Sequence, residues 1–150
     1  MMVPRGSEMA MSIEEIDDRG MAAWSKHDAQ AFVDIFAERF VLRDVSLPDP
    51  ITSRDDARAY AQAWFTAFPD MSVKQTNRVV SADSVAAEVE FTGTNTGPMI
   101  MGGNEIPPTG KSVVGVGAYF ATIRDDEVVE FAAYPDVAGM MMQLGLMPPM

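Results

Sequence analysis

The spacing of apolar residues changes once along the chain, after Pro69-Asp70, and this change limits the fold more than any other feature of the sequence. Before it, apolar residues recur every three or four positions, as on one face of a helix. From residue 71 to residue 95 the period is two, as in strands with one buried face, and further strands are predicted up to residue 136. Helices followed by a run of strands predict an α+β protein.

Three helices are predicted in the first part. Ser12 followed by Glu15 is a capping box that opens a helix at about residues 12–25. Asp28 can cap a short second helix, and Ser53 opens a third. The third helix has the strongest apolar stripe of the chain, formed by Ala57, Tyr60, Ala61, Trp64, Phe65 and Phe68.

A short strand at residues 40–45 is predicted between the second and third helices. Longer strands are predicted at residues 71–81, 85–95, 111–124 and 128–136. Asp125-Asp126 is the expected turn between the last two. The Gly- and Pro-rich segment 97–110 is predicted to be a loop that no regular element crosses, and a last helix is expected at residues 137–144.

Composition excludes several classes of partner. The formal net charge is −11 and the Lys and Arg residues are scattered, so we expect no nucleic-acid partner. No apolar run approaches the roughly 18 residues of a membrane span, so no membrane partner is expected. With one His and no Cys the chain has no plausible zinc ligand set, and we expect no metal site. No secretory signal is visible, which favours a cytoplasmic location.

Residues 1–10 contain Val3-Pro4-Arg5-Gly6-Ser7, which resembles the remnant of a thrombin-cleavable expression tag. We therefore take residues 11–150 as the native part. Its length suits a single domain with one hydrophobic core, and it contains no internal repeat or linker.

The functional prediction centres on Asp136, which ends the apolar segment 130–136 next to Tyr134 and precedes a Met-rich helix. A carboxylate shielded from water has a raised pKa and can take up and return protons. We then expect its side chain to reach into a cavity near Tyr134 or Tyr119. The alternative, which can coexist, is that Asp136 caps the last helix.

A curved sheet wrapped around helices leaves a concave space, in which Gly115 and Gly117 are placed to bend a long strand. Small-molecule sites in such spaces are mainly apolar. The side chains expected to bind substrate on its wall are Tyr60, Trp64, Phe68, Met99, Met101, Tyr119, Phe131, Tyr134 and Met141. Ordinary core packing is the alternative for them. Together with Met140 and Met142, the methionines predict an apolar, Met-lined pocket for a flat or polycyclic molecule.

Several phrases of the chain occur in a characteristic order: Trp24-Ser25-Lys26-His27-Asp28, Ala67-Phe68-Pro69-Asp70-Met71, Gly93-Thr94-Asn95-Thr96-Gly97-Pro98, Pro107-Pro108-Thr109-Gly110-Lys111, Asp136, and Gln143-Leu144-Gly145. In this order they resemble the SnoaL-like polyketide cyclase family, within the superfamily named after nuclear transport factor 2. The resemblance covers about residues 12–147.

The resemblance implies a cone-shaped curved antiparallel sheet wrapped around N-terminal helices, usually in a homodimer, with a pocket inside the cone. It also implies aldol closure of a polyketide, or a ketosteroid-isomerase-like reaction, without metal or organic cofactor. In the family an aspartate near the end of the last strand takes the proton alpha to a carbonyl and later protonates the alkoxide. Asp136, seven residues before Gln143, matches that aspartate.

The chain departs from the family pattern at Asn95 and Arg43, where relatives often have His. Asn95 is predicted to bond a substrate carbonyl or to fix the loop that starts at Thr96. Arg43 is predicted to bind an anionic oxygen or to form a surface salt bridge. Asp44 is either a second acid or the partner of a base. The one histidine, His27, is expected to be structural.

Three functions remain open at this stage. The first, which we expect, is an enzyme that transfers a proton next to a carbonyl through Asp136. The second is water activation by Arg43, Asp44 and Asp136, as in the epoxide hydrolases of the same superfamily. The third is a non-catalytic binder of an apolar small molecule, or a dimerisation module, because one fold often serves several functions. Tyr119 and Tyr134 carry hydroxyls of the kind that bind oxyanions.

Overall fold

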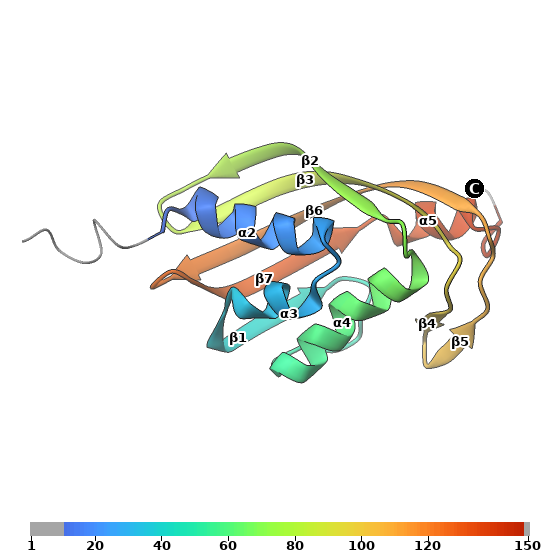
Figure 1. Ribbon diagram of the computed structural model, residues 1–150, viewed down its shortest axis with the longest axis horizontal. Coiled ribbons are helices and arrows are strands. Elements are labelled where there is room, and N and C mark those ends of the chain that lie inside the picture. Colours follow the sequence, from blue (N-terminus) through green and yellow to red (C-terminus); the bar gives the residue numbers. More distant parts are fainter. Residues whose placement is uncertain (1–10, 149–150) are drawn as a thin grey trace, which may run out of the picture.

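The computed structural model describes residues 11–148, in which helices cover one face of a curved sheet (Figure 1). The expected tag remnant, residues 1–10, lies outside the described residues. No helix in the described part is long and apolar enough to cross a membrane. The α+β arrangement expected from the sequence is confirmed, with helices and strands in the predicted order.

The helices begin where the capping residues predicted them. They are α2 (Ile13–Ser25), α3 (Ala29–Asp34), α4 (Arg54–Ala67) and α5 (Val137–Gln143). The side chains of Ser12, Asp28 and Ser53 each accept a hydrogen bond from a backbone N–H three residues on. These bonds satisfy N–H groups that have no partner inside the helix, and so they fix where each helix starts.

The main sheet has the strand order β1-β7-β6-β3-β2. Its strands are β1 (Phe36–Asp44), β2 (Ser72–Val80), β3 (Ser84–Thr94), β6 (Ser112–Arg124) and β7 (Glu127–Pro135). The four long strands pair antiparallel, as expected. β1 starts earlier than predicted and pairs parallel to β7 at the edge. Because no hairpin joins these two strands, nothing in the connection requires them to run in opposite directions.

The expectation that no regular element crosses residues 97–110 is wrong. A small hairpin of β4 (Met99–Met101) and β5 (Asn104–Ile106) forms within this segment, at the end of the sheet where α5 also lies (Figure 1). Its turn is Gly102-Gly103, where φ is +57° and +80°. Glycine adopts such angles without steric cost, which permits a two-residue turn even inside a Pro-rich segment.

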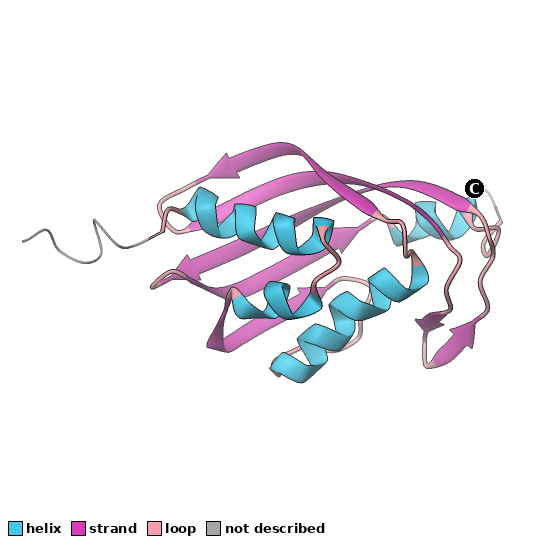
Figure 2. Ribbon diagram, viewed as in Figure 1, coloured by secondary structure: helices cyan, strands magenta, loops and turns pink. Residues whose placement is uncertain are grey.

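The core lies between the helices and the concave face of the sheet (Figure 2). Along β6, Tyr119, Ala121 and Ile123 are buried toward the helices, whereas Phe120 points outward and is exposed. A Cβ atom added at Gly115 would lie 2.3 Å from the ring of Phe91, its cross-strand partner in β3. The glycine therefore makes room for an aromatic ring that lies over the strand.

Asn95 ties the end of α4 to the loop that holds the small hairpin. Its side chain is fully buried, and its Nδ2 donates to the carbonyls of Ala67 at 3.1 Å and Gly97 at 3.0 Å. Its Oδ1 accepts from the backbone N–H of Thr109 at 2.8 Å and from the Thr109 hydroxyl at 2.9 Å. Of the two roles considered for Asn95, fixing the loop is the one that these bonds describe.

We predict that Asn95→Ala lowers the free energy of unfolding by about 3 kcal/mol, because it leaves several buried polar groups without partners. Denaturant unfolding followed by circular dichroism measures the change. Asn77→Ala is the matched control, since the exposed Asn77 makes one side-chain bond, to Glu88, and its loss should cost less than about 0.5 kcal/mol. Equal effects of the two substitutions would contradict the role given to Asn95.

Candidate functional site

A cavity of about 130 Å³ lies between the helices and the concave face of the sheet. It is close in size to an engineered cavity of about 150 Å³ that takes up benzene. Helices α2, α3 and α4 form one wall, and strands of the main sheet form the other. The lining is largely apolar, and in the described part of the chain Asp17 is its only carboxylate. Tyr60 and Tyr119 also line it, and each carries a hydroxyl group.

Asp17 is an ionisable side chain on the buried face of a helix. It lies one turn from Ile13 and from Met21 in α2, and only 7% of the residue is exposed. Removing a carboxylate from water costs several kcal/mol unless hydrogen bonds and a positive charge replace the lost hydration. Such partners are therefore needed around Asp17.

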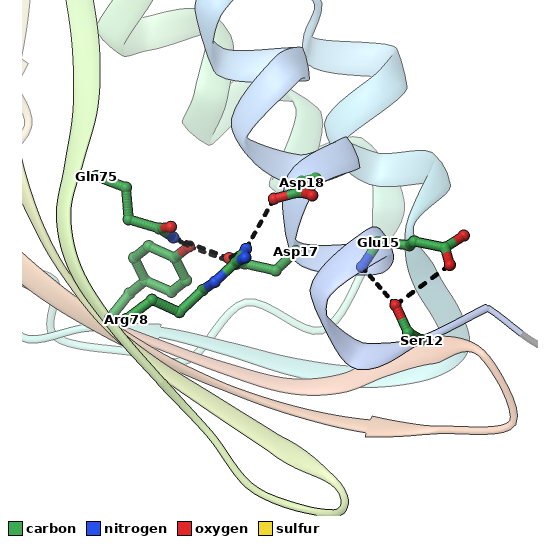
Figure 3. Close-up of polar contacts among 7 residues, drawn as sticks. Ser12, Glu15, Asp17, Asp18, Gln75 and Arg78 are labelled. Atoms are coloured by element: carbon green, nitrogen blue, oxygen red, sulfur yellow. Dashed lines mark hydrogen bonds and ion pairs between the residues drawn. The ribbon is translucent and has the colours of Figure 1, made fainter.

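The partners of Asp17 come from the sheet (Figure 3). The Tyr119 hydroxyl donates to Asp17 Oδ1 in a short hydrogen bond. Gln75 Nε2 donates to Asp17 Oδ2 at 2.8 Å and to the Tyr119 oxygen at 2.9 Å. Arg78 Nη1 lies 3.1 Å from Asp17 Oδ2 and 2.7 Å from Asp18 Oδ1, and so it bridges two carboxylates (Figure 3). Both oxygens of Asp17 are thus satisfied.

An irregularity in β2 lets the side chains of Gln75 and Arg78 both point toward Asp17. Gln75 and Arg78 are three residues apart, and in a regular strand their side chains would point to opposite faces. The pairing of β2 with β3 shifts register between Gln75 and Asn77. This bulge inserts one residue and turns both side chains toward Asp17, as bulges near functional sites do.

These contacts shift the pKa values of the groups around Asp17. Burial raises the pKa of Tyr119 far above its ordinary value, and the hydrogen bond to Asp17 raises it further. The pKa of Arg78 is raised first by its hydrogen bond to Asp18 and then by the one to Asp17. Tyr119 is therefore a neutral donor, and Arg78 is a permanent cation beside Asp17 and Asp18.

A second tyrosine of the cavity is also paired with a carboxylate. Asp44, at the end of β1, is only 4% exposed, and its Oδ2 accepts from the Tyr60 hydroxyl at 2.6 Å. Its Oδ1 accepts from the Ser46 backbone N–H at 2.8 Å and from the Ser46 hydroxyl. Burial, followed by the charge of Asp44, raises the pKa of Tyr60 well above its ordinary value. Asp44 is therefore not a lining residue of this cavity, but it is hydrogen-bonded to Tyr60, which is one.

Asp136 does not reach the cavity. It is exposed, it is the N-cap of α5, and its Oδ1 accepts from the Gly139 N–H at 2.9 Å. This corrects the expectation of a shielded base, and the capping alternative describes its place. Tyr134 is exposed too, on the outer face of the sheet, where its ring meets that of Phe120 at 5.8 Å between centroids.

The expected group of Arg43, Asp44 and Asp136 is not assembled. Arg43 forms an ion pair with Glu130 on the neighbouring strand, and both side chains are about half exposed. This is the surface salt bridge considered as its alternative role. Asp44 points instead toward Tyr60, because successive residues of a strand face opposite sides.

The expected aromatic wall is present in part. Tyr60, Trp64, Tyr119 and Phe131 line the cavity. Phe68 is buried behind it, where it packs on Trp64 and Phe91.

The structure corrects the expected methionine lining. Met99, Met101, Met140, Met141 and Met142 are not among the lining residues, and the methionines that are belong to other segments, at positions 21 and 71. Met99 and Met101 lie in the small hairpin, beyond the main sheet. The others lie in α5, which Gln143 anchors to the backbone of Val114.

The residues that sequence reasoning missed are Asp17, Gln75 and Arg78. Asp17 carried a readable signal, since it lies on the same helical face as Ile13, Met21 and Trp24. A charge within such a stripe indicates a paired, buried group. Gln75 and Arg78 carried no comparable signal, because their shared direction depends on the bulge.

His27 has the structural place expected of it. Its Nε2 lies 2.7 Å from the Met71 carbonyl oxygen, and its ring stacks on Phe65. In the described residues 11–148 no three His, Asp or Glu side chains gather in an arrangement that could hold a metal ion.

A family model shows the family of the chain, and solved structures show its fold. The model of the SnoaL-like polyketide cyclase family matches residues 14–144. No curated protein sequence matches significantly. A proposed SnoaL-like polyketide cyclase from Jannaschia sp. CCS1 has 22% identity and a TM-score of 0.78 over 91% of this chain and 92% of that chain.

Two further solved structures share the fold. AclR, a proposed hydroxylase from Streptomyces galilaeus, has 21% identity and a TM-score of 0.77, over 91% of this chain and 83% of that one. SalBIII is an epoxide hydrolase/cyclase-like enzyme of pyran ring formation in salinomycin. It has 17% identity and a TM-score of 0.68, over 84% of this chain and 92% of that chain. At these identities the likeness concerns the fold.

The two buried tyrosines predict how stability depends on pH. Their folded-state pKa values lie above the ordinary 10.0, so above pH 10 the unfolded chain loses their protons first. The stabilisation they contribute is fully present below pH 10 and is lost as the pH rises above it. Each should make the free energy of unfolding fall by about 1.4 kcal/mol per pH unit in that range.

Denaturant unfolding at several alkaline pH values measures this slope. Tyr60→Phe and Tyr119→Phe should each make the slope shallower by about 1.4 kcal/mol per pH unit, the share of one proton. Tyr134→Phe removes the third tyrosine of the chain, which lies outside the cavity, and serves as the reference. Phe variants with the wild-type slope would show that neither hydroxyl is held neutral by the fold.

Proposed function

The chain belongs to the family of SnoaL-like polyketide cyclases, and from this premise we propose that it catalyses proton transfer at a carbon next to a carbonyl group, with Asp17 as general acid and base. One observation carries the proposal: among the described residues 11–148, Asp17 is the only carboxylate in the lining of a largely apolar cavity. Apolar cavities with a few convergent polar groups are the usual sites of small-molecule chemistry. Asp17 takes the role that we expected of Asp136.

The chemistry needs one group that takes a proton and later returns it. The Asp17 carboxylate removes a proton from the carbon next to a carbonyl, and the electrons of the C–H bond form an enolate. In an aldol closure the enolate carbon then bonds to a second carbonyl carbon of the same molecule, whose oxygen becomes an alkoxide. Asp17 returns its proton to that oxygen, or to another carbon in an isomerisation. Protons and electrons balance without a further reactant.

The hydrogen bonds around Asp17 suit this exchange of charge. Gln75 and Arg78 hold Oδ2, so the orientation of the carboxylate is fixed before a substrate arrives. When Asp17 accepts a proton, the negative charge moves to the substrate. The Tyr119 hydroxyl, now next to a neutral acid, is then free to donate to the enolate oxygen. A donor held in a dry site stabilises developing charge more than it would in water.

Water activation is the second candidate, because Arg78 bridges Asp17 and Asp18 in an Asp–Arg–Asp arrangement. The likeness to an epoxide hydrolase/cyclase-like enzyme agrees with it at the level of the fold. The side chain of Asp18 is 66% exposed, however, and Asp18 is not among the lining residues. Only one of the two carboxylates therefore faces a bound molecule, which favours proton transfer. Binding without catalysis is the third candidate and is what a failed activity test would leave.

We predict that Asp17→Asn lowers the rate of proton transfer about a hundredfold or more, because an amide is not a base at neutral pH. The rate is that of hydrogen–deuterium exchange next to the carbonyl of 4-hydroxyphenylacetone in heavy water, followed by proton NMR. Asp136→Asn is the matched control: it makes the same chemical change at the cap of α5, where Asn caps nearly as well as Asp. It should keep the wild-type rate. If wild type does not exceed background, or Asp17→Asn matches wild type, the proposal fails.

We also propose that the protein forms a homodimer through the outer face of its sheet. Val114, Val116 and Phe120 point outward from β6, and Tyr134 does so from β7; all four are exposed. Together they form an apolar patch opposite the helices, and patches of this kind often mark protein–protein contacts.

We predict that Phe120→Glu converts this dimer to a monomer, because a carboxylate in the centre of an apolar contact would lose its hydration without gaining a partner. Light scattering at micromolar concentration gives the mass in solution. Glu88→Gln, a charge change on the same outer face of β3, should leave the mass of the dimer unchanged. A wild-type protein with the mass of a monomer would rule the dimer out.

A further inference from the structure

We infer that the cavity recognises a small neutral ring through a hydroxyl group, a phenol or an enol, and that Tyr60 sets this preference. The inference rests on the proposed function in that it names the kind of substrate for the same cavity. It is carried by the direction of hydrogen bonds at the cavity wall rather than by the chemistry of Asp17. The two ideas can therefore fail separately.

The hydroxyl protons of Tyr60 and Tyr119 are already donated in hydrogen bonds within the protein. A tyrosine hydroxyl carries one hydrogen, so it donates one hydrogen bond. Tyr60 donates to Asp44, and Tyr119 donates to Asp17. What these hydroxyls can offer a molecule in the cavity is therefore an oxygen that accepts a hydrogen bond. The Tyr119 oxygen already accepts from Gln75 at 2.9 Å. Trp64 is the corresponding side-chain partner of Tyr60, and it lowers the pKa of Tyr60 less than burial and Asp44 raise it, so we take Tyr60 as the more open acceptor.

The proton of Tyr60 is held in place by the burial of Asp44. Asp44 Oδ1 is occupied by the two donors of Ser46, so Oδ2 depends on Tyr60. Arg43, the neighbouring cation in the chain, is turned away toward Glu130. If Tyr60 rotated its hydroxyl toward a ligand, a buried carboxylate oxygen would lose its bond, at a cost of about 1–3 kcal/mol or more. The acceptor character of Tyr60 is thus built into the fold.

This arrangement discriminates among ligands of similar size. A phenol or enol donates its proton to the Tyr60 oxygen and satisfies both groups. A carbonyl oxygen at the same place would face another oxygen with no proton between them. A ligand that is already anionic in solution is disfavoured further, because no Lys, Arg or His is among the described residues that line the cavity. The volume of about 130 Å³ suits one ring rather than several.

Binding can be followed without a label, because both tryptophans of the chain, Trp24 and Trp64, line the cavity. We expect tryptophan fluorescence to give dissociation constants for phenol, benzaldehyde and toluene, which have a hydrogen-bond donor, an acceptor and neither. With the wild-type protein at neutral pH, phenol should bind about tenfold more tightly than benzaldehyde or toluene, the effect of one hydrogen bond.

Asp44→Asn provides the sharpest test. The amide oxygen of Asn can accept from Ser46, and its NH₂ group then donates to the Tyr60 oxygen. The Tyr60 hydroxyl is freed to donate into the cavity, and benzaldehyde should now bind more tightly than phenol. Tyr60→Phe, which removes the hydroxyl, should bind all three probes with similar affinity; it tests the inference even if Asp44→Asn fails to fold. Asp136→Asn, the same acid-to-amide change outside the cavity, should keep the wild-type order.

Several results would overturn the inference. They are wild-type protein that binds benzaldehyde or toluene as tightly as phenol, wild-type protein that binds none of the probes, Tyr60→Phe that keeps the preference for phenol, and a folded Asp44→Asn with the wild-type order. The exchange assay of Asp17→Asn is independent of these outcomes. A lost preference for phenol beside an intact effect of Asp17→Asn would remove this inference alone. The opposite pair of results would remove the proposed catalysis and leave the ligand preference standing.

Discussion

The burial of the Asp17 carboxylate is the constraint around which the site is arranged. A charge removed from water must be given equivalent partners inside the protein. Three side chains from two strands supply them, Gln75 and Arg78 from β2 and Tyr119 from β6. These bonds join α2 to the sheet by polar contacts, while aromatic side chains line the cavity beside them. The hydrogen bonds that hold Asp17 therefore also connect the helix wall of the cavity to its sheet wall.

Much of the fold could be predicted from the sequence, because local signals and the final structure agree. Ser12, Asp28 and Ser53 start helices in the expected places, and Asp125 and Asp126 have positive φ in the predicted turn. The parallel pairing of β1 with β7 could not be predicted from local pattern, since it joins segments far apart in the chain. The β4–β5 hairpin was missed because nearby prolines outweighed the turn signal of Gly102-Gly103.

The site was predicted less well than the fold, for a physical reason. The aromatic residues of the cavity follow from helical spacing and strand alternation, and Tyr60, Trp64, Tyr119 and Phe131 do line it. Asp136 was misplaced because β7 is apolar on both faces, so alternation did not show which way its end points. Pro135 ends the strand, and Asp136 turns outward to begin α5. The bulge that directs Gln75 and Arg78 depends on tertiary pairing and leaves no mark on the spacing of residues.

The parallel pair of β1 and β7 has a consequence for the order in which the molecule assembles. β1 is at the edge of the sheet, and its neighbour there is β7, the last strand of the main sheet to leave the ribosome. Asp17 likewise bonds to Tyr119, 102 residues further along the chain. Contacts between distant segments form late, since a long loop must close before they are made. During synthesis the N-terminal helices therefore emerge with an unpaired carboxylate and an uncovered strand, and the cavity is among the last parts of the protein to exist.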